Sequence, residues 1–250
     1  MKISITPRKL KGTIWVPPSK SQAHRLIIGA ALADGVSHLS NLAESQDIRA
    51  TLNCMQCLGA SVSQDGSEIT GVRLGQDRGP LPVLDCGESG STIRFLMPVA
   101  LAVAGGGVFL GRGRLLERPY RPYEAIFQQQ GITFQRQPDS ITLSGALKPG
   151  RFEVPGDVSS QFITGLLYAL PLLDGESEIV LTTALESQGY VDLTLEALKQ
   201  FGVQVSFTEH GWQVPGGQRY QSADVAVEGD YSGAAFFLCA GAISGDVTVE

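Results

Sequence analysis

Three short clusters of hydroxyl-bearing residues have the composition of anion-binding sites. They are Ser19–Ser21, Ser89–Thr92 and Ser159–Gln161, and each stands just before an apolar stretch that can form a buried helix. The first N–H groups of a helix have no partner within it, so hydroxyls there can cap the helix or help to bind a phosphate or carboxylate. A similar cluster, Asp230–Gly233, precedes a fourth apolar stretch. We therefore weigh recognition of an anion against simple helix capping.

The first cluster combines its hydroxyls with two cations. On a helix that begins near Ser19, Ser21 and Arg25 share one face because they are four residues apart, and Lys20 lies beside the free N–H groups. The third cluster offers Ser160 and an amide but no cation. The first cluster is therefore the strongest candidate for holding a negative charge.

A run of four arginines between Arg112 and Arg121 is a second source of positive charge. Such runs are usually solvated faces. We expect Arg118 to be the exception, because Pro119 stiffens the backbone and presents the side chain in a fixed direction.

The elements that must position these residues are repeated along the chain. Glycines that follow the four apolar stretches recur every 70 residues, at Gly35, Gly105, Gly175 and Gly245. Fixed self-similarity means that one supersecondary unit is used several times. Each unit reads β-α-β-α-β-β. Three units predict an α/β (α+β) fold with pseudo-three-fold symmetry, in which helices pack inside small sheets and the three clusters converge on one anionic ligand.

The pattern also predicts element and domain boundaries. We expect strands leading into the clusters at 12–16, 81–85 and 151–154, and second helices at 48–58, 123–130 and 192–201. Residues 17–225 form the complete three-repeat domain, whereas 1–16 are an N-terminal strand of another, incomplete domain that restarts at 226–250. We expect the chain to be a C-terminally truncated fragment.

Composition excludes several classes of function. The net charge of −6 argues against nucleic-acid binding, and no apolar run reaches the ~20 residues of a membrane span. The N-terminus lacks the pattern of a signal or transit peptide, so we expect a cytoplasmic protein. Cys54 and Cys57 form a C-x-x-C inside a helical pattern without a second ligand pair, so we expect no metal site.

Six motifs together carry a resemblance to a known family over essentially the whole chain. They are Pro18-Ser19-Lys20-Ser21 with Arg25, Asp85-Cys86-Gly87-Glu88-Ser89-Gly90-Ser91-Thr92-Ile93-Arg94, Glu117-Arg118-Pro119, Val158-Ser159-Ser160-Gln161-Phe162, Ser187-Gln188-Gly189-Tyr190-Val191-Asp192 and Val227-Glu228-Gly229-Asp230-Tyr231-Ser232. With these motifs the chain resembles the 5-enolpyruvylshikimate-3-phosphate synthases, the enolpyruvyl transferases of the shikimate pathway.

The resemblance implies transfer of the enolpyruvyl group of phosphoenolpyruvate to the 5-hydroxyl of shikimate 3-phosphate, without metal or organic cofactor, by a protein that is a monomer at full length. It implies a catalytic Lys20 between the two substrates. It places shikimate 3-phosphate on Ser21, Arg25, Ser159, Ser160, Ser187 and Tyr190, and phosphoenolpyruvate on Lys20, Gly90, Arg118 and Gln161.

The resemblance also implies what this chain lacks. The family's general-base aspartate and catalytic glutamate belong to a C-terminal portion without a counterpart here, so we expect no activity from this chain alone. Glu88 stands where many members have asparagine, and we expect it to face away from the site or to pair with Arg94.

Two other functions remain as alternatives. One is a non-catalytic domain that binds a phosphate-bearing ligand. The other is a UDP-N-acetylglucosamine enolpyruvyl transferase, which would typically have Lys-Asn in place of Lys20-Ser21 and a cysteine within the loop 111–121.

Overall fold

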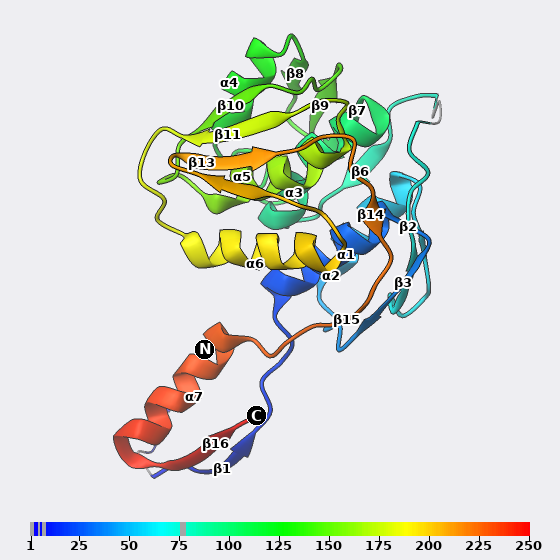
Figure 1. Cartoon of the computed structure of the whole chain (residues 1–250). Coiled ribbons are helices and arrows are strands. Elements are labelled where there is room, and N and C mark those ends of the chain that lie inside the picture. Colours follow the sequence, from blue (N-terminus) through cyan, green and yellow to red (C-terminus); the bar gives the residue numbers. More distant parts are fainter. Residues whose placement is uncertain (1–2, 5, 7–8, 76–78) are drawn as a thin grey trace.

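The computed structural model describes residues 3–4, 6, 9–75 and 79–250. Figure 1 shows a body of three similar units and a smaller outlying part. The first unit comprises α1 (Lys20–Leu32), β2 (Ala33–Asp34), β3 (Val36–Ser40), α2 (Gln46–Cys57), β4 (Ser61–Val62) and β5 (Glu68–Thr70). The second comprises β6 (Val83–Asp85), α3 (Gly90–Ala104), β7 (Gly106–Leu110), α4 (Arg121–Gln129), β8 (Thr133–Arg136) and β9 (Ser140–Ser144).

The third unit repeats this order and leads into the outlying part. It comprises β10 (Arg151–Val154), α5 (Ser160–Ala169), the 3₁₀ turn η1 (Leu170–Leu172), β11 (Ser177–Leu181), α6 (Gln188–Gln200), β12 (Ser206–Thr208) and β13 (Gly211–Val214), followed by β14 (Tyr220–Gln221) and β15 (Asp224–Ala226). The outlying part comprises β1 (Lys11–Ile14), α7 (Tyr231–Ser244) and β16 (Asp246–Val249).

Each unit of the body has a four-stranded sheet with the same strand order. The orders are β15-β3-β5-β4, β6-β7-β9-β8 and β10-β11-β13-β12. In each sheet the first strand is parallel to the second, and the remaining pairs are antiparallel. The predicted α/β architecture built from small sheets is thus confirmed.

Two strands are exchanged between distant parts of the chain. β6 and β10 each precede a buried helix and pair with the strand after it. By the same rule β1 would pair with β3, but it pairs with β16, and β15 takes its place beside β3. The strand expected at 12–16 is thus found at Lys11–Ile14, and its partner lies outside the first unit's sheet. Local sequence patterns do not specify strand partners. β1 precedes the apolar helix α1 just as β15 precedes the apolar helix α7, yet each pairs beside the other's helix.

The first helix of each unit forms the core. α1, α3 and α5 are apolar on most faces, and residues such as Leu26, Leu96 and Leu166 have no exposed surface. α3 ends at Gly105, whose φ of 69° lies in the left-handed region where glycine is favoured. Burial of these three helices supplies most of the hydrophobic free energy of the body.

The second helix of each unit bridges two core helices through one buried hydroxyl. Thr51 Oγ1 of α2 lies 2.7 Å from His24 Nδ1 on α1 and 2.7 Å from Thr92 Oγ1 on α3. Tyr123 Oη of α4 donates to main-chain carbonyls of α3 and α5. Thr194 Oγ1 of α6 contacts α5 and α1. The three positions are equivalent in the repeat, so the polar bridges follow the pseudo-three-fold arrangement.

The helix predicted at 192–201 begins earlier than expected, at Gln188. Neither Gln188 nor Gly189 has the fixed geometry that would prevent a helical first turn, and Ser187 occupies the position before it. Tyr190 therefore lies in the first turn of α6 and not in a loop.

The outlying part is connected to the body by two adjacent segments. Ser19 N–H donates to the Glu228 carbonyl at 2.8 Å, and Asp230 N–H donates to the Pro17 carbonyl at 2.8 Å. Figure 1 shows α7 standing away from the body. Its side chains are largely exposed, including Phe236 at 78%.

Among the described residues, no helix is long and apolar enough to cross a membrane.

Candidate functional site

The three predicted clusters do begin the core helices, and their first serines act as caps. The side chains of Ser19, Ser89 and Ser159 accept hydrogen bonds from N–H groups two or three residues further on, at 3.2–3.3 Å. Within each cluster, the first serine therefore caps the helix. The next residues, at the first turns of α1, α3 and α5, remain available for a ligand.

Ser21, Ser187 and Tyr190 lie together although 166 residues separate the first from the second. All three line a cleft of about 520 Å³ between α1, the start of α6 and the segment 228–232. Ser187 precedes α6 but makes no capping hydrogen bond through its side chain, and Tyr190 is 45% exposed. The cleft therefore presents two hydroxyls that capping does not use and an accessible phenol.

Arg25 lies buried behind this cleft, with 2% of its surface exposed. Its guanidinium donates to the hydroxyls of Thr194 (2.8 Å) and Thr164 (3.3 Å) and to the carbonyls of Ser21 (2.7 Å) and Tyr190 (2.8 Å). All four acceptors are neutral, and no carboxylate of the described residues lies within 4.0 Å. Burial lowers the pKa of Arg25. A buried cation without a counter-ion favours an anion nearby.

Aromatic rings cover part of the same guanidinium. Its central carbon lies 5.1 Å from the centroid of the Phe95 ring and 6.0 Å from that of the Tyr190 ring. These contacts partly compensate the buried charge. They also connect α3 and α6 to the charged end of Arg25.

A second group of residues gathers at the start of α3. The guanidinium of Arg118 lies against Gly90, so that a Cβ added to Gly90 would meet Arg118 Nη1. Arg94 donates to Gln161 Oε1 at 2.6 Å, and Gln161 Nε2 donates to Ser91 Oγ at 3.0 Å. The predicted residues Gly90, Arg118 and Gln161 are thus brought together, and α5 meets α3 through side chains of their first turns.

Arg94 is a member of this group that the sequence reasoning did not assign to the site. Its guanidinium carbon lies 5.7 Å from the Tyr120 ring centroid and 5.2 Å from that of Phe162. Its Nε is buried and has no partner among the described residues. Burial lowers the pKa of Arg94, and the charge of Arg118 acts in the same direction. Two neighbouring guanidinium groups therefore provide a strongly positive local field.

Arg118 differs from its neighbours in the arginine run. Arg112 pairs with Asp85 at 2.7 Å, and Arg114 pairs with Glu117 at 3.4 Å. Among the described residues, Arg118 has no carboxylate within 4.0 Å. Within the run, Arg112 and Arg114 are thus paired with carboxylates, whereas Arg118 lies against Gly90.

Lys20 is held by a residue that the sequence did not suggest. Its Nζ donates to Asp47 Oδ2 at 2.7 Å, and the Lys20 side chain is 55% exposed. Asp47 belongs to the first turn of α2, where an acidic residue is favourable. The pair orients the lysine at the start of α1, beside Ser21.

Ser159 and Ser160 stand at the first turn of α5, next to Gln161. Ser160 is buried, with 5% exposed surface, and Ser159 is partly exposed. The turn lies between the two groups, because α5 also carries Thr164, which contacts Arg25. Side chains of α5 thus contact both α3 and Arg25 of α1, whereas convergence of the three clusters on one anionic ligand stays a prediction.

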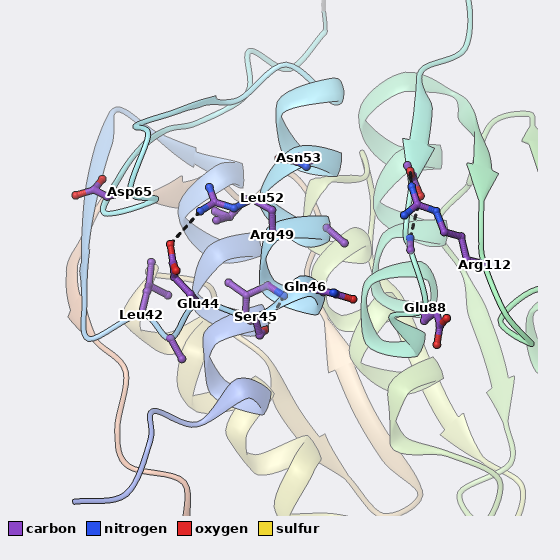
Figure 2. A pocket seen from close by; sticks show the side chains of 15 residues that line it. Leu42, Glu44, Ser45, Gln46, Arg49, Leu52, Asn53, Asp65, Glu88 and Arg112 are labelled. Atoms are coloured by element: carbon purple, nitrogen blue, oxygen red, sulfur yellow. Dashed lines mark hydrogen bonds and ion pairs between the residues drawn. The ribbon is translucent and has the colours of Figure 1, made fainter.

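Another hollow lies away from these residues. Figure 2 shows this hollow of about 710 Å³, with Glu44 and Arg49 on one side and Glu88 and Arg112 on the other. It contains none of the predicted site residues, and both of its arginines are paired with acidic side chains. Arg94 donates to Gln161 and does not pair with Glu88. The Glu88 carboxylate lies beside Gly113, on the side of this hollow.

No cluster of three or more potential metal-ligating side chains occurs within the described ranges of the chain. Cys54 and Cys57 both lie in α2, the former buried and the latter exposed.

Solved structures share this fold. A structure of EPSP synthase from Acinetobacter baumannii matches with a TM-score of 0.80 at 28% sequence identity, covering 96% of this chain and 55% of that one. A second structure of the same enzyme gives the same TM-score. The fold is thus enolpyruvyl transferase-like.

Sequence comparisons identify the family. A profile of the family described as EPSP synthase (3-phosphoshikimate 1-carboxyvinyltransferase) matches residues 5–250. The relative from Clostridium beijerinckii, named 3-phosphoshikimate 1-carboxyvinyltransferase, is 47% identical over 258 residues, and one from Clostridioides difficile is 45% identical over 260 residues. The chain belongs to the EPSP synthase family. It spans about three fifths of the length of these relatives, 59% and 60%.

Proposed function

We propose that this chain provides the shikimate 3-phosphate site, and part of the phosphoenolpyruvate site, of an enzyme that transfers an enolpyruvyl group between them. The observation that carries the proposal is Arg25, a buried cation without a carboxylate partner. It lies behind a cleft whose lining includes the hydroxyls of Ser21, Ser187 and Tyr190 and the carboxylates of Glu186, Glu228 and Asp230. Membership of the EPSP synthase family and the names of the relatives support the choice of substrates.

Shikimate 3-phosphate would occupy the cleft lined by Ser21, Ser187 and Tyr190. Its phosphate would accept from the hydroxyls of Ser159 and Ser160, because capping uses Ser159 Oγ only as an acceptor, and Arg25 would supply positive charge. The ring hydroxyls would bond to the exposed polar groups of the cleft.

Phosphoenolpyruvate would lie beside Gly90, where the backbone allows close approach. Arg118 and Gln161 would donate to its phosphate or carboxylate, and Lys20 would lie between the two substrates as the catalytic cation. Asp47 holds Lys20 in that direction. The Lys20 ammonium group would stabilise negative charge that develops as phosphate leaves.

The reaction itself requires proton transfers. The 5-hydroxyl oxygen of shikimate 3-phosphate adds to C2 of phosphoenolpyruvate while the hydroxyl proton is removed and C3 is protonated. The tetrahedral adduct then loses phosphate from C2 and a proton from C3. General acid–base groups close to both carbons are needed. We propose that these groups belong to the portion of the relatives that this chain does not match, so the chain alone binds but does not turn over.

The remaining expectations belong to the same proposal. Residues 17–225 act as one domain, and 1–16 with 226–250 contribute to a second. The whole protein acts on small molecules in the cytoplasm as a monomer, and neither metal nor organic cofactor takes part.

Calorimetric titration of this chain with shikimate 3-phosphate tests the proposal, with shikimate as the control. Binding that requires the phosphate is the expected result, together with the absence of product when phosphoenolpyruvate is added. Equal affinity for both ligands would overturn the assignment of Arg25. Preference for UDP-N-acetylglucosamine would point to the other enolpyruvyl transferase, and product formation would disprove the inactivity of the chain.

A further inference from the structure

The side-chain amide of Gln161 is held at both ends, and only one of its partners distinguishes the two ends. Its Nε2 donates to Ser91 Oγ at 3.0 Å, and its Oε1 accepts from Arg94 Nη1 at 2.6 Å. We propose that Arg94 is a positioning residue: it fixes the orientation of the Gln161 amide, so that one N–H remains directed to an anion bound beside Gly90. This inference rests on the proposed function, which places phosphoenolpyruvate there.

The chemistry of the two partners explains why Arg94 alone sets this orientation. A guanidinium carries only donors, so the amide must face Arg94 with its oxygen. A hydroxyl both donates and accepts, so Ser91 would bond to either end of the amide. Without the guanidinium both orientations would therefore be populated. In the turned orientation the amide oxygen would face the anion and repel it.

One amide N–H remains for a ligand. A glutamine amide has two N–H groups, and among the described residues only Ser91 accepts from Gln161 Nε2. The amide lies close to Gly90, because Arg94 Nη1 donates to Gln161 and would also lie 3.9 Å from a Cβ added to Gly90. Arg118 lies against Gly90 as well. An anion at this point would thus accept from both Gln161 and Arg118.

Two aromatic rings hold the Arg94 guanidinium in place. Its central carbon lies 5.7 Å from the centroid of Tyr120 and 5.2 Å from that of Phe162, and such cation–π contacts are attractive. No carboxylate of the described part of the chain lies within 4.0 Å of Arg94. The guanidinium therefore has a fixed place, and no acidic side chain competes with Gln161 for it.

NMR spectra of the chain test the orientation directly. In the unmodified chain, the Gln161 Nε2 protons should show a nuclear Overhauser effect to the Ser91 side chain. Arg94→Lys keeps a cationic donor and should keep the effect. Arg94→Met should weaken it, because Oε1 then faces Ser91 part of the time. An unchanged effect in Arg94→Met would refute the inference, and equal weakening in Arg94→Lys would show that packing, and not the donor, orients the amide.

A double-mutant cycle tests the consequence for binding. The measurement is a titration with phosphoenolpyruvate of a protein that contains this sequence and has the full length of the relatives. We expect Arg94→Met to lower the affinity about 10-fold. In a Gln161→Ala background the same substitution should lower it less than about 2-fold, because changes that act through one contact are not additive. Equal losses in both backgrounds would show that Arg94 acts through its own charge and would overturn the inference.

Two further variants separate loss of charge from loss of the donor. Arg112→Met removes a positive charge that is paired with Asp85, and it should leave the affinity unchanged. Gln161→Glu keeps an acceptor for Arg94 but has no N–H for the ligand, so the affinity should fall at least as far as in Gln161→Ala. Unchanged affinity in Gln161→Glu would contradict a donor role for the amide.

The two measurements also separate this inference from the proposed function. If the unmodified full-length protein fails to bind phosphoenolpyruvate while the NMR pattern holds, the proposed ligand is wrong and the positioning of Gln161 stands. If phosphoenolpyruvate binds but the amide orientation is the same with and without Arg94, the positioning is wrong and the proposed function stands.

Discussion

At the scale of single residues, the proposed site combines Lys20, which is paired with Asp47, with arginines that have no acidic partner. Arg25 and Arg118 fit this description among the described residues, whereas Arg112 and Arg114 are paired with carboxylates. When a ligand binds a paired arginine, it replaces the existing carboxylate partner, so the net contribution to the binding free energy is small. Unpaired arginines beside a cleft or a glycine can form new charge-assisted hydrogen bonds.

Replacement of Arg118 by alanine should weaken phosphoenolpyruvate binding by about 1.5–3 kcal/mol, because a charge-assisted hydrogen bond is lost. The measurement is a titration with phosphoenolpyruvate of a protein that contains this sequence and has the full length of the relatives. Arg114→Ala is the control and should have no effect, since Arg114 already pairs with Glu117. Unchanged affinity in Arg118→Ala would show that Arg118 is a solvated surface arginine that does not contact the ligand.

Gly90→Ala should act through the same arginine. An added Cβ would meet Arg118 Nη1, so the guanidinium must move away from the start of α3. We expect weaker phosphoenolpyruvate binding and unchanged affinity for shikimate 3-phosphate, both measurable by calorimetry. In an Arg118→Ala background the same substitution should have almost no further effect, because two changes that act on one contact are not additive. Additive losses would show that Gly90 acts independently.

The sequence suggested the residues of the proposed site but not the partners that support them. Ser21, Arg25, Gly90 and Gln161 carry their own signals of residue type at a helix start. Asp47, Arg94 and Thr194 enter the site only through tertiary packing. The sequence did hold one signal for Arg94. It stands 70 residues after His24 and 70 before Thr164, and each of these two residues contacts the buried hydroxyl of a second helix.

At the scale of elements, close packing of α1 against α6 positions Arg25 beside Thr194. Gly29 of α1 faces Phe201 at the end of α6, and an added Cβ would overlap the aromatic ring. Both residues are buried. Glycine is therefore required here for the approach of the two helices.

Gly29→Ala should destabilise the fold by about 1–3 kcal/mol, because an overpacked contact forces the helices apart. Urea denaturation followed by circular dichroism measures the change. Gly189→Ala provides the comparison: a Cβ there meets nothing within 4 Å, and alanine should be neutral or slightly stabilising in the first turn of α6. Equal stability of the two variants would contradict the packing argument.

Element types followed from periodicity and caps, whereas strand partners did not. The apolar helices, their serine caps and the α/β class were predictable because each rests on local residues. The exchange of β1 and β15 was not, since pairing of a strand with a distant partner depends on the whole chain. The early start of α6 shows the same limit, because it decides whether Tyr190 belongs to a loop or to the helix.

At the scale of the whole molecule, stability should depend on pH through buried His24. Burial, the largest cause, lowers its pKa from 6.5 to about 3, and the charges of Lys20 and Arg25 act in the same direction while that of Asp47 opposes it. The folded protein thus keeps His24 neutral, whereas the unfolded chain binds a proton below about pH 6.5. Stability is fully present above that pH and falls as the pH decreases toward 3.

The free energy of unfolding should therefore decrease by roughly 1 kcal/mol per pH unit between pH 6 and 4 because of this residue alone. Urea titrations at several pH values measure the slope. His24→Gln should reduce the slope, whatever its effect on stability at pH 7. His210→Gln should leave it unchanged, because the His210 side chain is 70% exposed. An unchanged slope in His24→Gln would show that other groups cause the acid sensitivity.

The exchange of strands has a consequence for how the protein is made. β3 leaves the ribosome early, but its parallel neighbour β15 begins only at Asp224, after the sheets of the second and third units are complete. At roughly 5–20 residues per second, the edge of β3 waits about 10–40 s for its partner. During that time its unpaired main-chain groups can pair with strands of other nascent chains. The unit that is synthesised first is thus finished last, and chaperones that shield strand edges should matter most for this short period.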